Sequence, residues 1–117
     1  MELTFTAYQE AAARTAQTAW PNEKRVAVDC YGLVAEVGEL LDEFQHRFEH
    51  ERPLDLAQVQ EELGDMLWRM ADLCSALDIR LGDIAQANIA KLQIRHPNGF
   101  SATTSKLRQD KAQDAAA

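Results

Sequence analysis

The chain has 117 residues, 46% of them hydrophobic, and a formal net charge of -7. Its length suffices for one domain with a modest core. The negative charge disfavours a protein that binds a nucleic-acid duplex, because like charges repel. It does not exclude polyphosphate ligands, since bound metal ions can supply positive charge. With only three prolines and five glycines, and many alanine, leucine, glutamate and glutamine residues, the composition favours an all-α fold.

Residues 1–19 contain neither a long apolar run nor a basic start. The sequence therefore shows no signal peptide and no membrane span, and we expect a cytoplasmic protein. Cys30 and Cys74 both fall within apolar helical patterns, and we expect them to be buried free thiols.

Two helices are expected in the first half of the chain. The first covers about residues 6–19 and ends before Pro21, because proline disfavours a helical residue before it. The second covers about residues 24–50, and the segment 51–53 with its proline ends it. Its apolar residues recur at steps of three and four, which is typical of helix-packing seams; they are Val26, Cys30, Leu33, Val37, Leu40, Phe44 and Phe48.

Two further helices are expected in the second half. Asp55 is a suitable N-cap for a helix ending near residue 77, and Gln58 would complete a capping box. The apolar residues of this helix are again three and four apart; they are Leu56, Val59, Leu63, Met66, Met70, Leu73 and Leu77. A fourth helix covers about residues 81–95. We expect one domain over residues 1–101, and a loose, polar, alanine-rich tail over residues 102–117.

The second and third helices each carry a pair of acidic residues three positions apart. The pairs are Glu36 with Glu39 and Glu62 with Asp65, and residues at this spacing share a helix face. A short turn joins the two helices, so they should pack antiparallel. Both pairs are then offset to the same side of the seam, and their heights differ by roughly 4.5 Å. The four carboxylates should therefore face one common space.

Four carboxylates in a small volume repel one another unless a cation is bound among them. Ligands that are all oxygen suit hard ions such as Mg²⁺, particularly where phosphates complete the coordination. Gly38 and Gly64 lie inside the pairs, and glycine costs a helix interior about 1 kcal/mol, which suggests a local requirement. The alternative is that all four acids are solvated surface charges.

The residues around these pairs resemble the MazG-like, all-α nucleoside triphosphate pyrophosphohydrolases. The resemblance lies in the segments GLVAEVGE (32–39) and EELGDMLW (61–68) and in a closing motif in which NIAKL (88–92) leads to RHPNGFS (95–101). It covers about residues 6–101. Three linked motifs in order make a specific signal. The resemblance implies an antiparallel four-helix bundle whose core is shared in an oligomer, either a homodimer or a dimer of dimers.

The resemblance also implies a reaction and the residues that perform it. Glu36, Glu39, Glu62 and Asp65 would be the catalytic metal ligands for Mg²⁺, with Mn²⁺ as a substitute. A metal-activated water would attack the α-phosphorus and release pyrophosphate. The expected substrate-binding residues lie outside the acidic pairs; they are Asn88, Lys91, Arg95 and Trp20.

Other interpretations of these substrate-binding residues remain open. Lys91 and Arg95 near a helix C-terminus are also favoured there by the helix dipole. Trp20 would stack on a nucleobase or lie in the core, whereas Trp68 is expected to pack. Two departures from the family pattern, His96 in place of tyrosine and Arg69 in place of an aromatic residue, bear on substrate preference.

Further acidic and histidine residues on the second helix point to no separate metal site. We interpret Asp29 and Glu43 as solvated charges, with support of the metal site as the alternative. His46 and His50 have a spacing that can bind Zn²⁺, but no third ligand is evident. A di-iron carboxylate site would need a second Glu-x-x-His motif, which the sequence lacks. From another functional class, the alternative to the enzyme is a non-catalytic helical oligomeric module for regulation or interaction.

Overall fold

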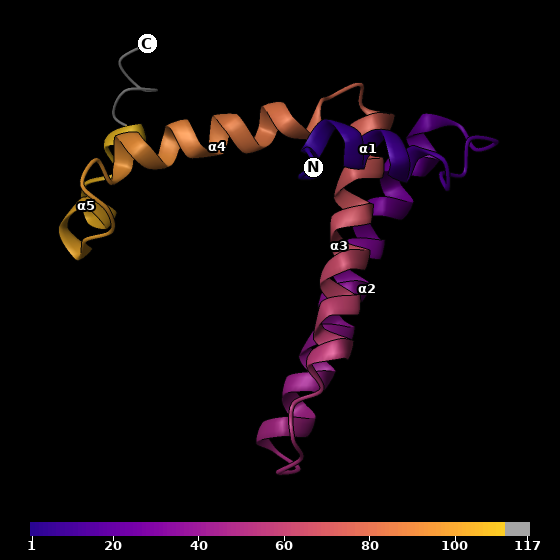
Figure 1. Cartoon of the computed structure of the whole chain (residues 1–117), viewed down its shortest axis with the longest axis horizontal. Helices are drawn as coiled ribbons and strands as arrows, with labels where there is room; N and C mark the ends of the chain where they lie inside the picture. Colours follow the sequence, from indigo (N-terminus) through magenta and orange to yellow (C-terminus); the bar gives the residue numbers. More distant parts are fainter. Residues whose placement is uncertain (112–117) are drawn as a thin grey trace. The chain divides into compact units, whose positions relative to one another are not determined.

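The computed structural model describes residues 1–111, and this range is all-helical (Figure 1). The helices are α1 (Phe5–Ala13), α2 (Asn22–Phe48), α3 (Leu56–Ala76), α4 (Leu81–Arg95) and α5 (Ala102–Leu107). The all-α prediction is therefore confirmed. None of these helices is both long enough and apolar enough to cross a membrane. The chain divides into two compact units, the first ending at Leu81 and the second beginning at Gly82, and each is described by itself.

Helix α1 is shorter than the predicted range of 6–19. Its N-cap is Thr4, whose hydroxyl accepts from the backbone N–H of Ala7. After Ala13 the chain forms tight turns, and the hydroxyl of Thr15 donates to the carbonyl of Ala12. Trp68 on α3 then donates its indole N–H to the same hydroxyl at 2.8 Å. The Thr15 side chain thus competes with the helical backbone and is held by a tertiary contact, which sequence periodicity does not reveal.

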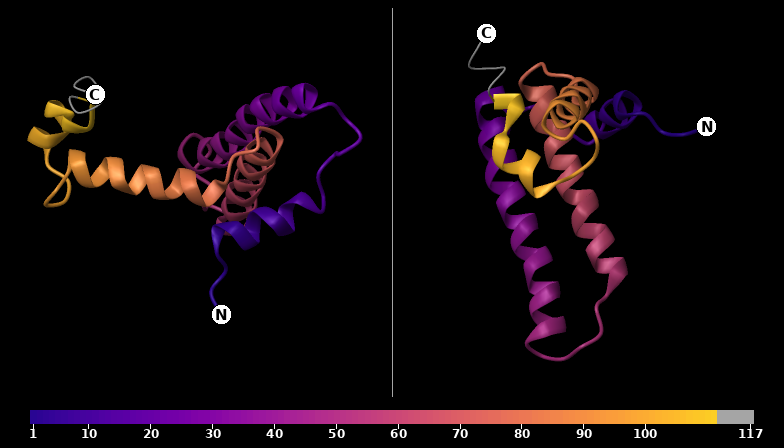
Figure 2. Two further views of the ribbon diagram at one scale, coloured as in Figure 1. Left: turned by 90° about the horizontal axis from the view of Figure 1, so that it is seen from above. Right: turned by 90° about the vertical axis from the view of Figure 1, so that its left-hand side faces the viewer.

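Helices α2 and α3 form an antiparallel hairpin, with the two helices side by side in Figure 2. Asp55 is the N-cap of α3, as predicted, and accepts from the backbone N–H groups of Ala57 and Gln58. The predicted second bond of the capping box, from the backbone N–H of Asp55 to the side chain of Gln58, is absent. The backbone N–H of Asp55 donates to Glu43 at 3.0 Å, and the Gln58 amide donates to Glu62 instead.

The predicted apolar seam of α2 is only half buried in the hairpin. Val26, Leu33 and Leu40, seven residues apart, are partly buried, whereas the alternate members Cys30, Val37 and Phe44 are exposed. The inward face of α2 is instead completed by polar or small residues, which include Asp29, Gly32, Glu36 and Glu43. The prediction that Cys30 is buried is therefore wrong for the isolated chain, while Cys74 is buried as expected.

The apolar core of the first unit lies where α1 packs on the C-terminal half of α3. Its buried residues are Ala71, Cys74 and Leu81, with Tyr8, Ala12 and Leu67 packed against them. Gln9 on α1 forms hydrogen bonds with the turn that follows α3, at one end of this core. Its amide N–H₂ donates to the carbonyl of Ile79 at 2.9 Å and its oxygen accepts from the backbone N–H of Leu81. These bonds satisfy backbone groups in the turn between α3 and α4.

The second unit contains α4 and the short helix α5. Ser101 caps α5, and its hydroxyl accepts from the backbone N–H of Thr104 at 3.1 Å. The Thr104 hydroxyl also lies 2.6 Å from Nδ1 of His96, at the end of α4. The segment predicted as a loose tail thus begins with α5, and residues 112–117 lie outside the described residues. The packing of α4 in a four-helix bundle and the shared oligomeric core stay predictions.

Candidate metal site

The hairpin brings three of the four predicted carboxylates together. Glu36 on α2 and Glu62 and Asp65 on α3 each offer an oxygen, and these oxygens lie within 4.8 Å of one another. Oxygens at this separation can share one divalent cation, because each would lie 2.0–2.6 Å from the ion. The antiparallel pairing of the helices and the three-residue spacing of Glu62 and Asp65 produce this arrangement. The prediction also included Glu39, which lies outside the group of three. The role of these residues as metal ligands stays a prediction.

Two carboxylate oxygens in this cluster lack a hydrogen-bond partner. Glu62 is 3% exposed, and its Oε1 accepts from the Gln58 amide at 2.6 Å. Its Oε2 and the Oε2 of Glu36 are buried without a partner among the described residues. Buried anionic oxygens without partners are costly. Their all-oxygen chemistry and negative charge fit a divalent cation, which would supply the missing interaction.

The crowding of the carboxylates also changes their affinity for protons. Burial raises the pKa of Glu36 to about 7, and the adjacent carboxyl groups of Glu62, Glu39 and Asp65 act in the same direction. The pKa of Glu39 is raised above its usual range, chiefly by the adjacent Glu62 carboxyl group. The cluster therefore retains a proton near neutral pH when no cation is bound.

Because the ion-free cluster keeps a proton, the free energy of unfolding should depend on pH when a chelator is present. The pKa of Glu36 is about 7 in the folded chain against an ordinary value of 4.5. Its contribution is therefore complete below pH 4.5 and is lost as the pH rises through 7. The free energy of unfolding of the unmodified chain should therefore fall between pH 5 and pH 8. In Glu36→Gln this fall should be smaller by roughly 2 kcal/mol. Urea titrations at both pH values would measure it, and an unchanged decrease in Glu36→Gln would contradict it.

Glu39 lies beside the cluster but is fully exposed to solvent. It lines an open groove of about 300 Å³ that continues toward the turn between α2 and α3; the other lining residues are Asp42, Glu43, Asp55, Gln58 and Glu62. The groove is wide enough for a hydrated cation or a phosphate-bound ion. Glu39 could thus contact a ligand from the solvent side of the groove, whereas Glu62 is buried at its base.

The structure does not support the predicted reason for the two glycines. A Cβ atom built on Gly38 or Gly64 would meet no other atom within 4 Å, so neither position needs glycine within one chain. Gly32 differs, because its Cβ would lie 2.6 Å from Nε of Arg69. Glycine at position 32 therefore leaves room for the Arg69 side chain to cross from α3 to α2.

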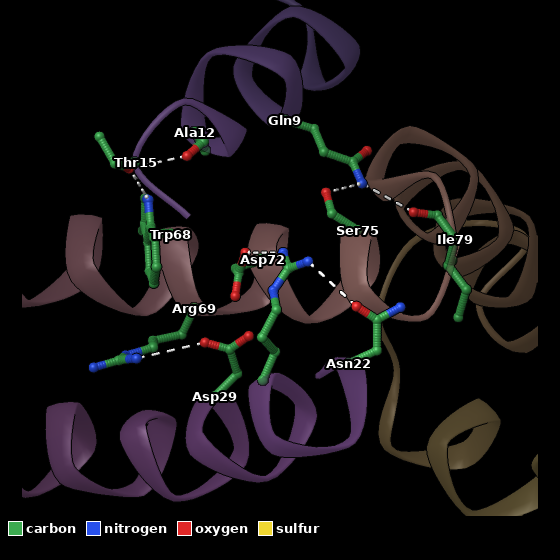
Figure 3. A network of polar contacts seen from close by, with 11 residues as sticks. Gln9, Ala12, Thr15, Asn22, Asp29, Trp68, Arg69, Asp72, Ser75 and Ile79 are labelled. Carbon is green, nitrogen blue, oxygen red and sulfur yellow. Dashed lines mark hydrogen bonds and ion pairs between the residues drawn. The ribbon is translucent and has the colours of Figure 1, made fainter. Parts of the chain in front are cut away.

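Two helical turns from the acidic pairs, the hairpin holds a buried charge cluster (Figure 3). Arg25 donates to Asp72 at 2.6 Å, and Arg69 lies 3.4 Å from Asp29. Asp29 is 2% exposed and Asp72 is 6% exposed. The interpretation of Asp29 as a solvated charge is therefore wrong. Burial raises its pKa to about 7, with a further contribution from a hydrogen bond with Asp72.

Trp20 lies next to this charge cluster and not among the acidic pairs. It is half-buried, and the ammonium group of Lys24 lies 4.2 Å from its ring. Together with Trp68 it lines a small cavity of about 30 Å³ above Arg25, Asp29 and their partners. Trp68 is likewise half-buried, which agrees with its predicted packing role, and its indole N–H donates to Thr15.

The three remaining predicted substrate residues belong to α4. Asn88 and Lys91 are exposed. Arg95 is engaged instead by Asp110, to which its Nε and Nη2 both donate at 3.1 Å. Sequence reasoning missed Asp110, because it lies beyond the last apolar periodicity.

His46 on α2 and His50, just after the end of this helix, gain no third ligand among the described residues. The rings of His46 and His50 are 5.9 Å apart. Among residues 1–111, the cluster of Glu36, Glu62 and Asp65 is the group of three or more potential ligands that the fold brings together. The described residues thus offer one candidate metal centre.

Comparison with known proteins agrees with this geometry. The chain is 33% identical over 72 residues to the Gene 37 protein of Mycobacterium phage L5. The match covers 58% of this chain and 63% of the phage protein, so it spans less than two thirds of that relative. A search of solved structures gave no match. The family model "MazG nucleotide pyrophosphohydrolase domain" matches residues 30–100, which include both acidic pairs. The chain therefore belongs to the MazG nucleotide pyrophosphohydrolase domain family.

Proposed function

We propose that the protein is a Mg²⁺-dependent hydrolase that converts a nucleoside triphosphate to a monophosphate and pyrophosphate. The observation that carries the proposal is the meeting of Glu36, Glu62 and Asp65, with two buried carboxylate oxygens that lack partners. Family membership supports the reaction class. Mn²⁺ would be a substitute, because it accepts the same oxygen ligands.

Glu36, Glu62 and Asp65 would hold the ion, and Glu39 would approach it from the exposed side. When bound, Mg²⁺ would offset the charge of the phosphates and lower the pKa of a water molecule. In the reaction the water oxygen bonds to the α-phosphorus, and the bond from that phosphorus to the bridging oxygen breaks, so pyrophosphate leaves. The proton lost by the water passes to a neighbouring carboxylate or to solvent.

Side chains outside the acidic pairs would bind the rest of the nucleotide. We propose that Asn88 and Lys91, both exposed on α4, bind phosphate oxygens, for which an amide and an ammonium group are suitable. Arg95 would do so once Asp110 releases it. Trp20 would stack on the nucleobase, although its place beside the buried charges equally serves packing.

We also propose that the enzyme works as a homodimer or a dimer of dimers. Exposed apolar residues follow one flank of the hairpin at seven-residue spacing; they are Val37 and Phe44 on α2, and Leu56, Leu63, Met70 and Leu77 on α3. A contiguous apolar flank of this kind is typical of a helical interface. An active species with the mass of a monomer in light scattering would contradict this proposal.

The test of function is a product analysis with a panel of ribo- and deoxyribonucleoside triphosphates. We expect equal amounts of pyrophosphate and monophosphate, formed with Mg²⁺ and abolished by a chelator. Release of orthophosphate would point to a different reaction. If the folded protein binds Mg²⁺ and hydrolyses no member of the panel, the alternative of a non-catalytic helical oligomeric module is favoured.

A further inference from the structure

The second unit contains a carboxylate that is held by two guanidinium groups. Asp110 is 3% exposed. Its two oxygens accept from Nε and Nη2 of Arg95 at 3.1 Å and from Nε and Nη2 of Arg108 at 3.3 Å. Each arginine thus makes the two-pronged contact that guanidinium groups make with both carboxylates and phosphates.

The chain bends sharply to place Asp110 there. Arg108 follows α5 with a φ of 49°, a left-handed conformation that is unfavourable for a non-glycine residue. The carbonyl of Thr104 accepts its backbone N–H at 3.3 Å. The contact with Arg95 therefore depends on a turn that is unfavourable by itself, and a competing anion could release it.

The surrounding segment is basic, although the whole chain is acidic. Residues 91–111 contain five lysine or arginine residues and a single acidic residue, Asp110. The remainder of the chain carries the acidic excess. Two guanidinium groups facing one carboxylate leave a net positive charge, and the attraction of a multiply charged phosphate for them exceeds that of a single carboxylate.

We propose that Arg95 and Arg108 form a binding site for a phosphate group of the nucleotide, and that Asp110 occupies this site until the nucleotide displaces it. Residues 101–110 then act as an autoinhibitory strap. The inference rests on the proposed function for the identity of the anion, since a nucleoside triphosphate and its pyrophosphate product both supply such groups. It adds Arg108 to the residues that contact substrate and gives the segment after α4 a regulatory role.

Pyrophosphate binding in the presence of a chelator tests the proposal without any catalysis. If Asp110 fills the site for nine tenths of the time, its removal strengthens anion binding about tenfold. We therefore expect Asp110→Asn to bind pyrophosphate about tenfold more tightly than the unmodified chain in calorimetry. Asp83→Asn, which removes the same charge from the first turn of α4, should leave the affinity unchanged.

A double variant separates the site from a general change in charge. Arg108→Gln added to Asp110→Asn should remove most of the gained affinity, because one of the two guanidinium groups is lost. In the unmodified chain, the side-chain N–H signals of both arginines should shift together in NMR spectra as pyrophosphate is added. No tighter binding in Asp110→Asn, or a gain that survives loss of Arg108, would overturn the proposal.

A failure of the anion-site proposal can be distinguished from a failure of the proposed enzymatic function. Tighter pyrophosphate binding in Asp110→Asn with no hydrolysis of any nucleotide would keep the anion site and reject the enzyme. Hydrolysis in the nucleotide panel with no effect of Asp110→Asn on pyrophosphate affinity would keep the enzyme and reject the strap.

Discussion

Replacing Glu62 with glutamine is expected to lower kcat/KM for nucleotide hydrolysis by at least about 100-fold, on the scale of losses that follow removal of a group stabilising charge in the transition state. Glu62 is the most buried member of the acidic cluster, and its Oε2 has no partner in the described residues. Glutamine keeps the oxygen that accepts from Gln58 but removes the charge that would hold a cation. The variant should fold, because it relieves repulsion among the carboxylates.

Glu61→Gln is the matched control for this prediction. Glu61 is the neighbouring acid on α3, and it is exposed and lies outside the cluster. The same change of charge there should leave kcat/KM within about twofold of the unmodified enzyme, as expected for a surface substitution. Steady-state assays with Mg²⁺ would measure both variants. If Glu62→Gln retained most of the activity, the acidic cluster would not be the catalytic metal site.

Replacing Arg25 with glutamine is expected to destabilise the fold by about 3 kcal/mol, the size of effect seen when one partner of a buried ion pair is removed. Arg25 lies 2.6 Å from Asp72, and their side chains are 12% and 6% exposed. The pKa of Asp72 is lowered despite its burial, because hydrogen bonds with Asp29 and Arg25 stabilise its charged form. Without Arg25, this buried charge would lose its closest cation.

Urea unfolding would measure the change, with Arg47→Gln as the matched control. Arg47 lies on the same helix and is exposed, so its replacement should change the free energy of unfolding by less than about 0.5 kcal/mol. Adding Asp72→Asn to Arg25→Gln should recover part of the loss, because no charge then lacks its partner. Equal effects of Arg25→Gln and Arg47→Gln would show that the buried pair contributes nothing specific.

The lengths of the central helices could be predicted well from the sequence. Pro21 and the cap at Asp55 set the beginnings of α2 and α3, and these signals act locally. Helix α2 ends at Phe48, well before Pro53. Helix α4 covers residues 81–95, as predicted. The end of α1 depended on the Trp68 contact with Thr15, which joins residues far apart in the sequence and was therefore not predictable.

The convergence of the acidic pairs was predictable because it follows from helix geometry. Three-residue spacing and antiparallel pairing bring Glu36, Glu62 and Asp65 together whichever side chains fill the rest of the seam. The predicted apolar seam of α2 was partly wrong. The spacing of apolar residues alone does not distinguish the face that packs on α3 from a second apolar face that is exposed. Asp29 and Gly32 take inward positions on α2 that apolar periodicity assigned to neighbouring residues.

The buried charges were missed for a related reason. Arg25 and Asp29 are four apart on α2, and Arg69 and Asp72 are three apart on α3, a spacing that placed each pair on one helix face. An ionised residue is seldom buried unless it is paired, so Asp29 was expected at the surface. Testing opposite charges across the antiparallel register could have found the cluster. Asp110 offered no such signal, because it lies beyond the last predicted helix and no helix register pairs it with Arg95.

The most direct test of the central claim is a titration with Mn²⁺ followed by electron paramagnetic resonance, in which a bound ion loses the signal of the free ion. The unmodified chain and Glu61→Gln should both bind Mn²⁺, and Mg²⁺ should compete for the same site. Glu62→Gln and Asp65→Asn should lose this binding at the same concentrations. Equal Mn²⁺ binding by all four proteins would contradict the claim that the paired acids of α2 and α3 form the metal site.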